Sequence, residues 1–165
     1  MNKYAVYLLI ALTGVLTSFK PKEASKPKEA EMKWHDWNEG FKIADKKDKL
    51  ILVDVYTSWC GWCKRMDHDT YADAGIQEQI NKDFVPVKLN PELKDLVYKV
   101  DTMSLNGFQL LDMLTNYQRN GYPTIIIVNP RLKRVMLAQA GYQDANQFKQ
   151  TLANAVAAKN GTGQK

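Results

Sequence analysis

The stretch Leu50-Ile51-Leu52-Val53-Asp54-Val55-Tyr56-Thr57-Ser58-Trp59-Cys60-Gly61-Trp62-Cys63-Lys64 decides the fold. Residues 50–56 are apolar almost throughout, which is typical of a central strand in a sheet that is covered on both faces. This strand stops at a Cys-x-x-Cys motif that opens a helix, and a helix N-terminus offers free N–H groups and positive potential to a thiolate. Cys60 and Cys63, the only cysteines of the chain, are therefore predicted to form a redox-active dithiol.

Three other roles for the cysteines fit less well. A structural disulfide that closes so short a loop would remove little chain entropy. A structural zinc site usually needs four Cys or His ligands, and the chain adds only His35 and His68, in no familiar ligand spacing. A covalent haem site would need His after the second cysteine, where Lys64 stands. We therefore expect neither a metal nor an organic cofactor.

With its flanks, the sequence resembles the thioredoxin superfamily, and most closely the exported thioredoxin-like proteins of bacteria. Four stretches carry the resemblance, in the family's order: 53–64, Val87-Lys88-Leu89-Asn90, Gly121-Tyr122-Pro123-Thr124, and Gly141 before the last helix. They cover most of the chain from about residue 33 to 158, apart from one insertion. The resemblance implies an α/β thioredoxin-like fold, in which helices flank a central mixed β-sheet.

The N-terminal segment is predicted to be an export signal. Lys3 supplies a positive charge, and residues 4–16 form an apolar stretch that is short for a membrane span but of normal length for a signal. No clean cleavage site follows, so residues 1–19 are either a signal peptide or an N-terminal anchor. We expect a periplasmic protein that touches the membrane only through this segment, if it is uncleaved.

The rest of the chain divides into a tether, one domain and a tail. Residues 20–32 are rich in lysine, glutamate and proline and should form a flexible charged spacer. Residues 33–159 have the length of a single domain, and residues 160–165 are expected to be disordered. The net charge of +5 comes partly from lysines in the tether and tail, which argues against nucleic acid as a partner. We expect a monomer.

Hydrophobic periodicity predicts the elements of the domain. Helices are expected over 34–44, 60–68 and 76–80. A last helix is expected after Asp144, which forms a capping-box pattern with Gln147. Strands are expected over 50–56, 84–89, 124–128 and 134–140, the last two as an antiparallel hairpin.

Residues 91–120 form an insertion that is longer than the matching part of a minimal thioredoxin. Its apolar residues predict two helices, one around 93–100 and one around 108–114. Two interpretations stay open, namely an added helical layer that thickens the fold and a lid or client-binding element beside the dithiol.

The cysteines and two charged residues are the predicted catalytic groups. Cys60 should be the exposed attacking thiolate, and Cys63 the more buried cysteine that resolves the mixed disulfide. The resemblance implies that Asp54 is a buried carboxylate that moves the proton of Cys63, and that Lys88 pairs with it. The alternative for Asp54 is a strand residue that faces solvent. His68 should lie at the surface, too far along the helix to be a base for Cys60.

Five further residues are expected to bind clients: Trp59, Gly61, Trp62, Tyr122 and Pro123. Pro123 matches the family's cis-proline, which would lie against the dithiol, and the alternative is a trans-proline at the start of a strand. Gly61 and Trp62 replace the Gly-Pro of common thioredoxins, so the strong reducing potential of those proteins does not transfer to this chain.

The predicted function is that of an exported thiol–disulfide oxidoreductase, which exchanges electrons with protein disulfides through a Cys60–Cys63 disulfide. We favour a reductase that receives electrons from a membrane donor. The alternatives are a disulfide oxidase or isomerase, and a redox-silent thioredoxin-fold module that binds partners. Retention of both cysteines argues against the redox-silent module.

Overall fold

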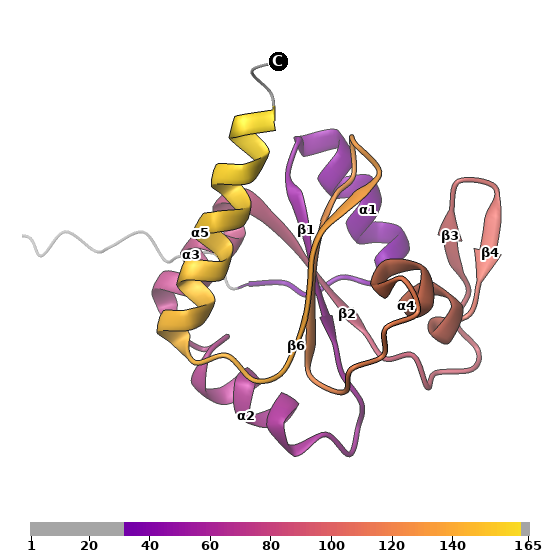
Figure 1. The fold of residues 1–165 in the computed structure, drawn as a ribbon, viewed down its shortest axis with the longest axis horizontal. Coiled ribbons are helices and arrows are strands. Elements are labelled where there is room, and N and C mark those ends of the chain that lie inside the picture. Colours follow the sequence, from indigo (N-terminus) through magenta and orange to yellow (C-terminus); the bar gives the residue numbers. More distant parts are fainter. Residues whose placement is uncertain (1–31, 163–165) are drawn as a thin grey trace, which may run out of the picture.

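A computed structural model describes residues 32–162 of the chain (Figure 1). The predictions for the signal or anchor segment 1–19, for nearly all of the tether and for residues 163–165 lie outside the described residues. The predicted start of the tail at residue 160 is wrong, because the last helix continues to Thr162. Within residues 32–162, no helix combines the length and apolar character that crossing a membrane requires.

A four-stranded mixed sheet forms the centre of the fold, in the order β2-β1-β5-β6. Its strands are β1 (Leu50–Val55), β2 (Phe84–Leu89), β5 (Thr124–Asn129) and β6 (Arg134–Ala140). β1 runs parallel to β2 and antiparallel to β5, and β5 and β6 form the predicted antiparallel hairpin. All residues of β1 and β5 are buried, as expected for central strands covered on both faces.

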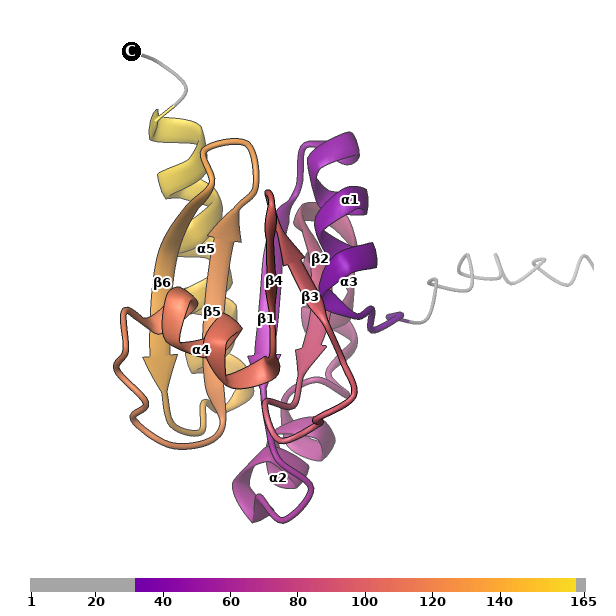
Figure 2. The same ribbon diagram turned by 90° about the vertical axis from the view of Figure 1, so that its right-hand side faces the viewer.

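Helices cover both faces of this sheet (Figures 1 and 2). The helices are α1 (Trp37–Lys47), α2 (Gly61–Asp69), α3 (Ala74–Asp83), α4 (Gly107–Thr115) and α5 (Ala145–Thr162). The side chains of α1 and α4 join one apolar cluster, and those of α2, α3 and α5 join the other. Alternate residues of β1 point to opposite faces, so Leu50 enters one cluster and Ile51 the other.

The first helix begins later than the periodicity predicted. Asp36 is its N-cap, and the Asp36 side chain accepts a hydrogen bond from the Glu39 N–H at 3.0 Å. Trp34 therefore lies before the helix and packs edge-to-face on Tyr71, with the two ring centroids 4.9 Å apart. At the other end of the chain, Asp144 caps α5 in the predicted manner.

The first half of the insertion is a β-hairpin, so the helix predicted around residues 93–100 is wrong. Strands β3 (Tyr98–Val100) and β4 (Met103–Leu105) pair antiparallel, and side chains of α1 hold them. The Trp37 indole donates a hydrogen bond to the Lys99 carbonyl at 3.0 Å, and the Asn38 side chain accepts one from the Lys99 N–H at 2.7 Å. These bonds satisfy backbone groups of the hairpin. The periodicity of the hairpin's own sequence gives no sign of such long-range partners. The second predicted helix is α4, which has a capping box at Asn106.

Candidate active site

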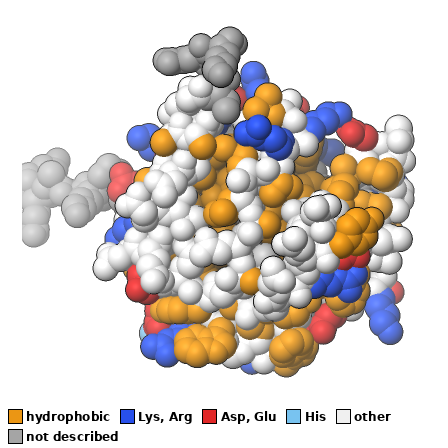
Figure 3. Space-filling view, in the orientation of Figure 1, with side chains coloured by type: hydrophobic (Ala, Val, Ile, Leu, Met, Phe, Trp, Pro, Cys, Tyr) orange, Lys and Arg blue, Asp and Glu red, His pale blue; other side chains and the backbone are white. Residues whose placement is uncertain are grey.

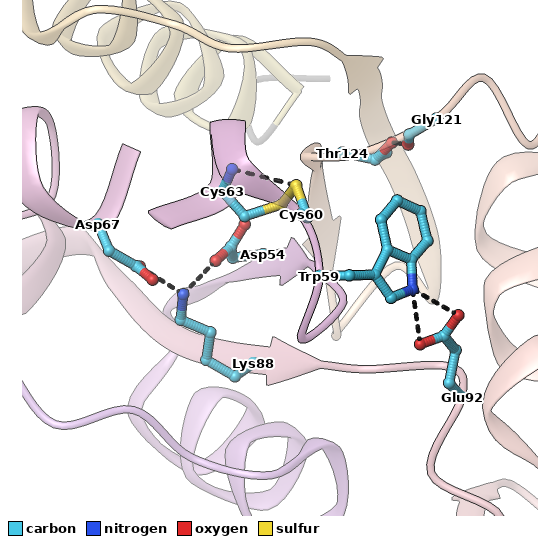
Figure 4. The surroundings of a disulfide bond; sticks show 9 residues. All are labelled: Asp54, Trp59, Cys60, Cys63, Asp67, Lys88, Glu92, Gly121 and Thr124. Atoms are coloured by element: carbon cyan, nitrogen blue, oxygen red, sulfur yellow. Dashed lines mark hydrogen bonds and ion pairs between the residues drawn. A yellow bond between two sulfur atoms is a disulfide. The ribbon is translucent and has the colours of Figure 1, made fainter. Parts of the chain in front are cut away.

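The two cysteines lie where β1 gives way to α2, as Figure 4 shows. Cys60 is the N-cap of α2 and is joined to Cys63 by a disulfide with an S–S distance of 2.07 Å. The Cys60 sulfur accepts a hydrogen bond from the Cys63 N–H at 3.1 Å. One sulfur thus occupies the positive end of the helix, where a negative charge on it would be stabilised.

Both cysteines are buried in this disulfide form. Cys60 is 5% exposed and Cys63 is 3% exposed, so the prediction of an exposed Cys60 is not met. The reason is that the Cys60 sulfur turns toward Cys63 and the first turn of α2. His68, further along α2, is exposed and lies 2.7 Å from Asp69, as expected for a surface residue.

Residues 121–124 approach the disulfide from the start of β5. The Tyr122–Pro123 peptide bond is cis, and Pro123 is buried. Thr124 pairs with Val55 at the end of β1, which places this segment beside the cysteine motif (Figure 4). The Thr124 hydroxyl donates a hydrogen bond to the Gly121 carbonyl at 2.6 Å and so ties this turn together.

Trp59 stands exposed on one side of the disulfide. Its indole Nε1 lies 3.1 Å and 3.2 Å from the two carboxylate oxygens of Glu92, which follows the first residue of the insertion. Its ring meets Tyr122 edge-to-face, with the centroids 5.8 Å apart. Glu92 thereby connects the insertion to the active-site loop, a contact that no local sequence signal indicated.

Trp62 is also exposed, and a second aromatic contact supports it. The centroid of its ring lies 5.5 Å from that of Tyr142, and the Arg65 guanidinium lies 5.4 Å from the Trp62 centroid and 5.6 Å from the Tyr142 centroid. Figure 3 shows apolar side chains exposed along the lower end of the molecule, where α2 lies in Figure 1. Gly61, between Cys60 and Trp62, has nothing within 4 Å of the position that a Cβ would take.

Asp54 is buried under the disulfide, so the alternative of a solvent-facing strand residue is wrong. It is 1% exposed, and its Oδ2 lies 2.5 Å from the Lys88 ammonium. Figure 4 shows the Asp54 carboxylate between Lys88 and the cysteines. Burial raises the pKa of Asp54, because the charged form loses its hydration, and the Lys88 charge opposes that rise. Burial lowers the pKa of Lys88, but the charges and hydrogen bonds of Asp54 and Asp67 together outweigh this, and the net shift is upward.

Two residues that sequence reasoning missed join this buried pair. Asp67 on α2 places its Oδ1 2.5 Å from the Lys88 ammonium, and its position four residues after Cys63 was the available signal. The Tyr71 hydroxyl lies beside Asp54 but makes no hydrogen bond of ordinary geometry within residues 32–162. Burial first, and then the charge of Asp54, raise the pKa of Tyr71 well above its usual value.

Residues 20–159 match the thioredoxin-like DsbH family, which is described as a protein of unknown function, DUF255. The thiol:disulfide interchange protein DsbD of Yersinia pestis is 26% identical over 113 residues, which cover 68% of this chain but 17% of that protein. A similar match to DsbD of Actinobacillus pleuropneumoniae covers 16% of its length. The chain therefore spans about a sixth of the length of these DsbD proteins.

Solved structures show the same fold. A thioredoxin from Thermus thermophilus aligns with a TM-score of 0.61 at 17% identity, over 81% of this chain and 94% of that one. A DsbH oxidoreductase aligns with a TM-score of 0.60 at 13% identity, over 85% and 95%. The C-terminal domain of DsbD from Neisseria meningitidis, in its reduced form, gives 0.52 at 17% identity, over 70% and 90%. With its thioredoxin-like fold and a family match over most of its length, the chain belongs to the thioredoxin-like DsbH family of the thioredoxin superfamily.

Proposed function

We propose that the chain is an exported thiol–disulfide oxidoreductase that reduces protein disulfides through Cys60 and Cys63. The observation that carries this proposal is the position of the Cys60 sulfur, which caps α2 and accepts the Cys63 N–H at 3.1 Å. A sulfur at this point is stabilised as a thiolate, the form that attacks disulfides. The name of DsbD as a thiol:disulfide interchange protein supports the same class of reaction.

The reaction begins with the reduced dithiol. The Cys60 thiolate attacks one sulfur of a client disulfide, forms a mixed disulfide and releases the other client sulfur as a thiolate. Cys63 then transfers its thiol proton to the Asp54 carboxylate, and the resulting thiolate attacks the Cys60 sulfur. This step releases the second client thiolate and forms the Cys60–Cys63 disulfide, so that two electrons have passed to the client. The form described here corresponds to that oxidised product.

The surface around the disulfide suits a protein client. Exposed Trp59 and Trp62 flank the cysteines, each supported by a tyrosine, and they offer large apolar contacts. Nothing lies within 4 Å of a Cβ placed on Gly61, and half-buried Tyr122 and buried Pro123 lie beside the cysteines. We assign these five residues to client binding and Lys88 to the support of Asp54. The chemistry needs only the two sulfurs and a proton acceptor, so the proposal includes no metal or organic cofactor.

A reductase must be reduced again after each reaction. We propose that a membrane electron donor supplies the electrons in the periplasm, because the sequence predicts that residues 1–19 direct export. A reporter fused after Lys165 should then be active only if it is of a kind that works outside the cytoplasm. Activity of a reporter that works only in the cytoplasm would contradict this location.

Trapping of mixed disulfides tests the proposed chemistry. The Cys63→Ser variant should accumulate mixed disulfides with clients, because Cys60 can attack and nothing resolves the product. The Cys60→Ser variant should accumulate almost none, and the variant that lacks both cysteines gives the background. Equal trapping by the two single variants would refute the assignment. The equilibrium potential of the pair in glutathione buffers then separates the reductase from the oxidase or isomerase, which requires a more oxidising value.

A further inference from the structure

Lys88 is shared between two carboxylates that differ in their exposure. Its ammonium lies 2.5 Å from Oδ2 of Asp54 and 2.5 Å from Oδ1 of Asp67. The Asp54 side chain is 2% exposed, the Lys88 side chain 20% and the Asp67 side chain 47%. The lysine thus connects a buried acid under the disulfide with an acid at the surface of α2, as Figure 4 shows.

Three aromatic rings surround the same ammonium. Its nitrogen lies 4.6 Å from the ring centroid of Trp34, 5.1 Å from that of Tyr56 and 5.4 Å from that of Tyr71. Ring faces attract cations at such distances. These contacts favour the position in which the ammonium reaches both carboxylates.

The charges at this site do not balance when both acids are ionised, because two carboxylates face one cation. Asp67 accepts one of the three N–H bonds that an ammonium can donate, and it also repels the Asp54 charge. A lysine paired with Asp54 alone would stabilise the carboxylate form and weaken its attraction for a proton. Asp67 counteracts that effect.

We propose that Asp67 is a positioning residue of the dithiol site. It accepts one hydrogen bond from the Lys88 ammonium, and so keeps Asp54 able to take the proton of the Cys63 thiol. This inference rests on the proposed function. In the resolving step, the S–H bond of Cys63 breaks, an O–H bond forms on Asp54, and the sulfur keeps the electron pair with which it attacks Cys60.

Three titratable side chains from different elements lie near Asp54. Lys88 comes from β2, Asp67 from α2 and Tyr71 from the segment after α2, while the partner of Asp54 on β5 is the apolar Ile125. Burial is the largest cause of the raised pKa of Asp54, the charge and hydrogen bond of Lys88 oppose it, and the charge of Asp67 adds to it. Removal of the Asp67 charge should therefore lower the pKa of Asp54.

The test is a carbon-13 NMR titration of the Asp54 carboxyl group in the oxidised protein. Asp67→Asn keeps the shape of the side chain and an oxygen for Lys88 but removes the charge. We expect the Asp54 midpoint to move to lower pH in Asp67→Asn and to higher pH in Lys88→Met. Asp69→Asn is the matched control, because Asp69 lies on the same helix but bonds to Arg65 and His68. Its Asp54 midpoint should stay at the wild-type value.

The pH dependence of disulfide reduction supplies the second measurement. The acid limb of the rate profile should move to lower pH in Asp67→Asn, in parallel with the NMR midpoint, and should stay in place in Asp69→Asn. An Asp54 midpoint that is the same in Asp67→Asn and wild type would overturn the role of Asp67 and leave the proposed function standing. A wild-type protein that reduces no disulfide would overturn the proposed function and, with it, the role of Asp67 in proton transfer.

Discussion

We expect the Asp54→Asn variant to have a higher free energy of unfolding than the wild-type protein at neutral pH. The Asp54 carboxylate is buried, and its Oδ1 makes no hydrogen bond within residues 32–162. A buried polar group without a partner costs about 1–3 kcal/mol, and ionisation adds to that cost. The neutral Asn side chain avoids the buried charge and retains an oxygen that can accept a hydrogen bond from Lys88.

Removing one member of a buried ion pair usually costs about 3–5 kcal/mol, because the other charge is left alone. Here that penalty does not arise, since Lys88 keeps Asp67 at 2.5 Å. We therefore expect a net gain of about 1–2 kcal/mol, within the range known for replacing buried ionic groups. For a domain of this size, the melting temperature should rise by roughly 3–6 °C.

The gain should depend on pH in a definite direction. The pKa of Asp54 is raised by burial above its ordinary value of 3.8, so the folded state binds this proton more tightly than the unfolded state. The stability that Asp54 contributes is present below its unfolded pKa and is lost as the pH rises through its folded pKa. Asn does not titrate, so the advantage of the variant should grow across that window and then level off.

The difference in stability between Asp54→Asn and wild type is measured by urea unfolding of the oxidised proteins, monitored by far-UV circular dichroism at a series of pH values from acid to alkaline. Asp95→Asn is the control, because Asp95 is exposed in the loop before β3. Disulfide reduction by the Asp54→Asn variant should become slower at the resolving step. A variant less stable than wild type at neutral pH, or a stability difference that does not change with pH, would refute the reasoning.

Three further predictions concern the stability of the fold. Gly107→Ala should lower the free energy of unfolding, measured in urea, by about 2–3 kcal/mol, because the added Cβ would lie 2.6 Å from the Cα of Pro91. The control Gly61→Ala should not lower it, because nothing lies within 4 Å of the added Cβ. Phe148→Ala should lower the free energy of unfolding by about 3–5 kcal/mol, because the ring is fully buried and its removal leaves a cavity. A smaller loss in calorimetry would show that the surrounding side chains collapse into this cavity. Asp36→Ala should cost about 1 kcal/mol through loss of the α1 cap, and an unchanged thermal midpoint would contradict this.

Much of the fold was predictable because its determinants are local. The apolar runs of β1 and β5, the capping pattern at Asp144 and the switch from strand to helix at Cys60 are all confirmed. The hairpin in the insertion was not predictable in this way. It depends on hydrogen bonds from Trp37 and Asn38, which are about 60 positions away in the sequence.

The candidate site also contains residues that the sequence predicts and residues that only the tertiary structure brings together. The cysteines follow from the motif, and Asp54 and Lys88 from the family resemblance. Asp67 comes from α2 and Lys88 from β2, 21 positions apart in the sequence, and three aromatic residues from separate segments meet around the Lys88 ammonium. A contact set of this kind arises from tertiary packing, which no periodicity within one segment encodes.

The close approach of Gly107 to Pro91 has a consequence for how this domain can vary. The chain leaves the central sheet before Pro91 and comes back to Pro91 at Gly107, where a Cβ would lie 2.6 Å from both the Cα and the carbonyl oxygen of Pro91. The two ends of segment 92–106 thus nearly touch. A loop whose ends meet can be lengthened, trimmed or exchanged at small entropic cost and without moving the elements that it joins. The exposed tip of the β3–β4 hairpin at residues 101–102 can in this sense change in length, while Tyr98 stays buried in the core and Glu92 keeps its contact with Trp59.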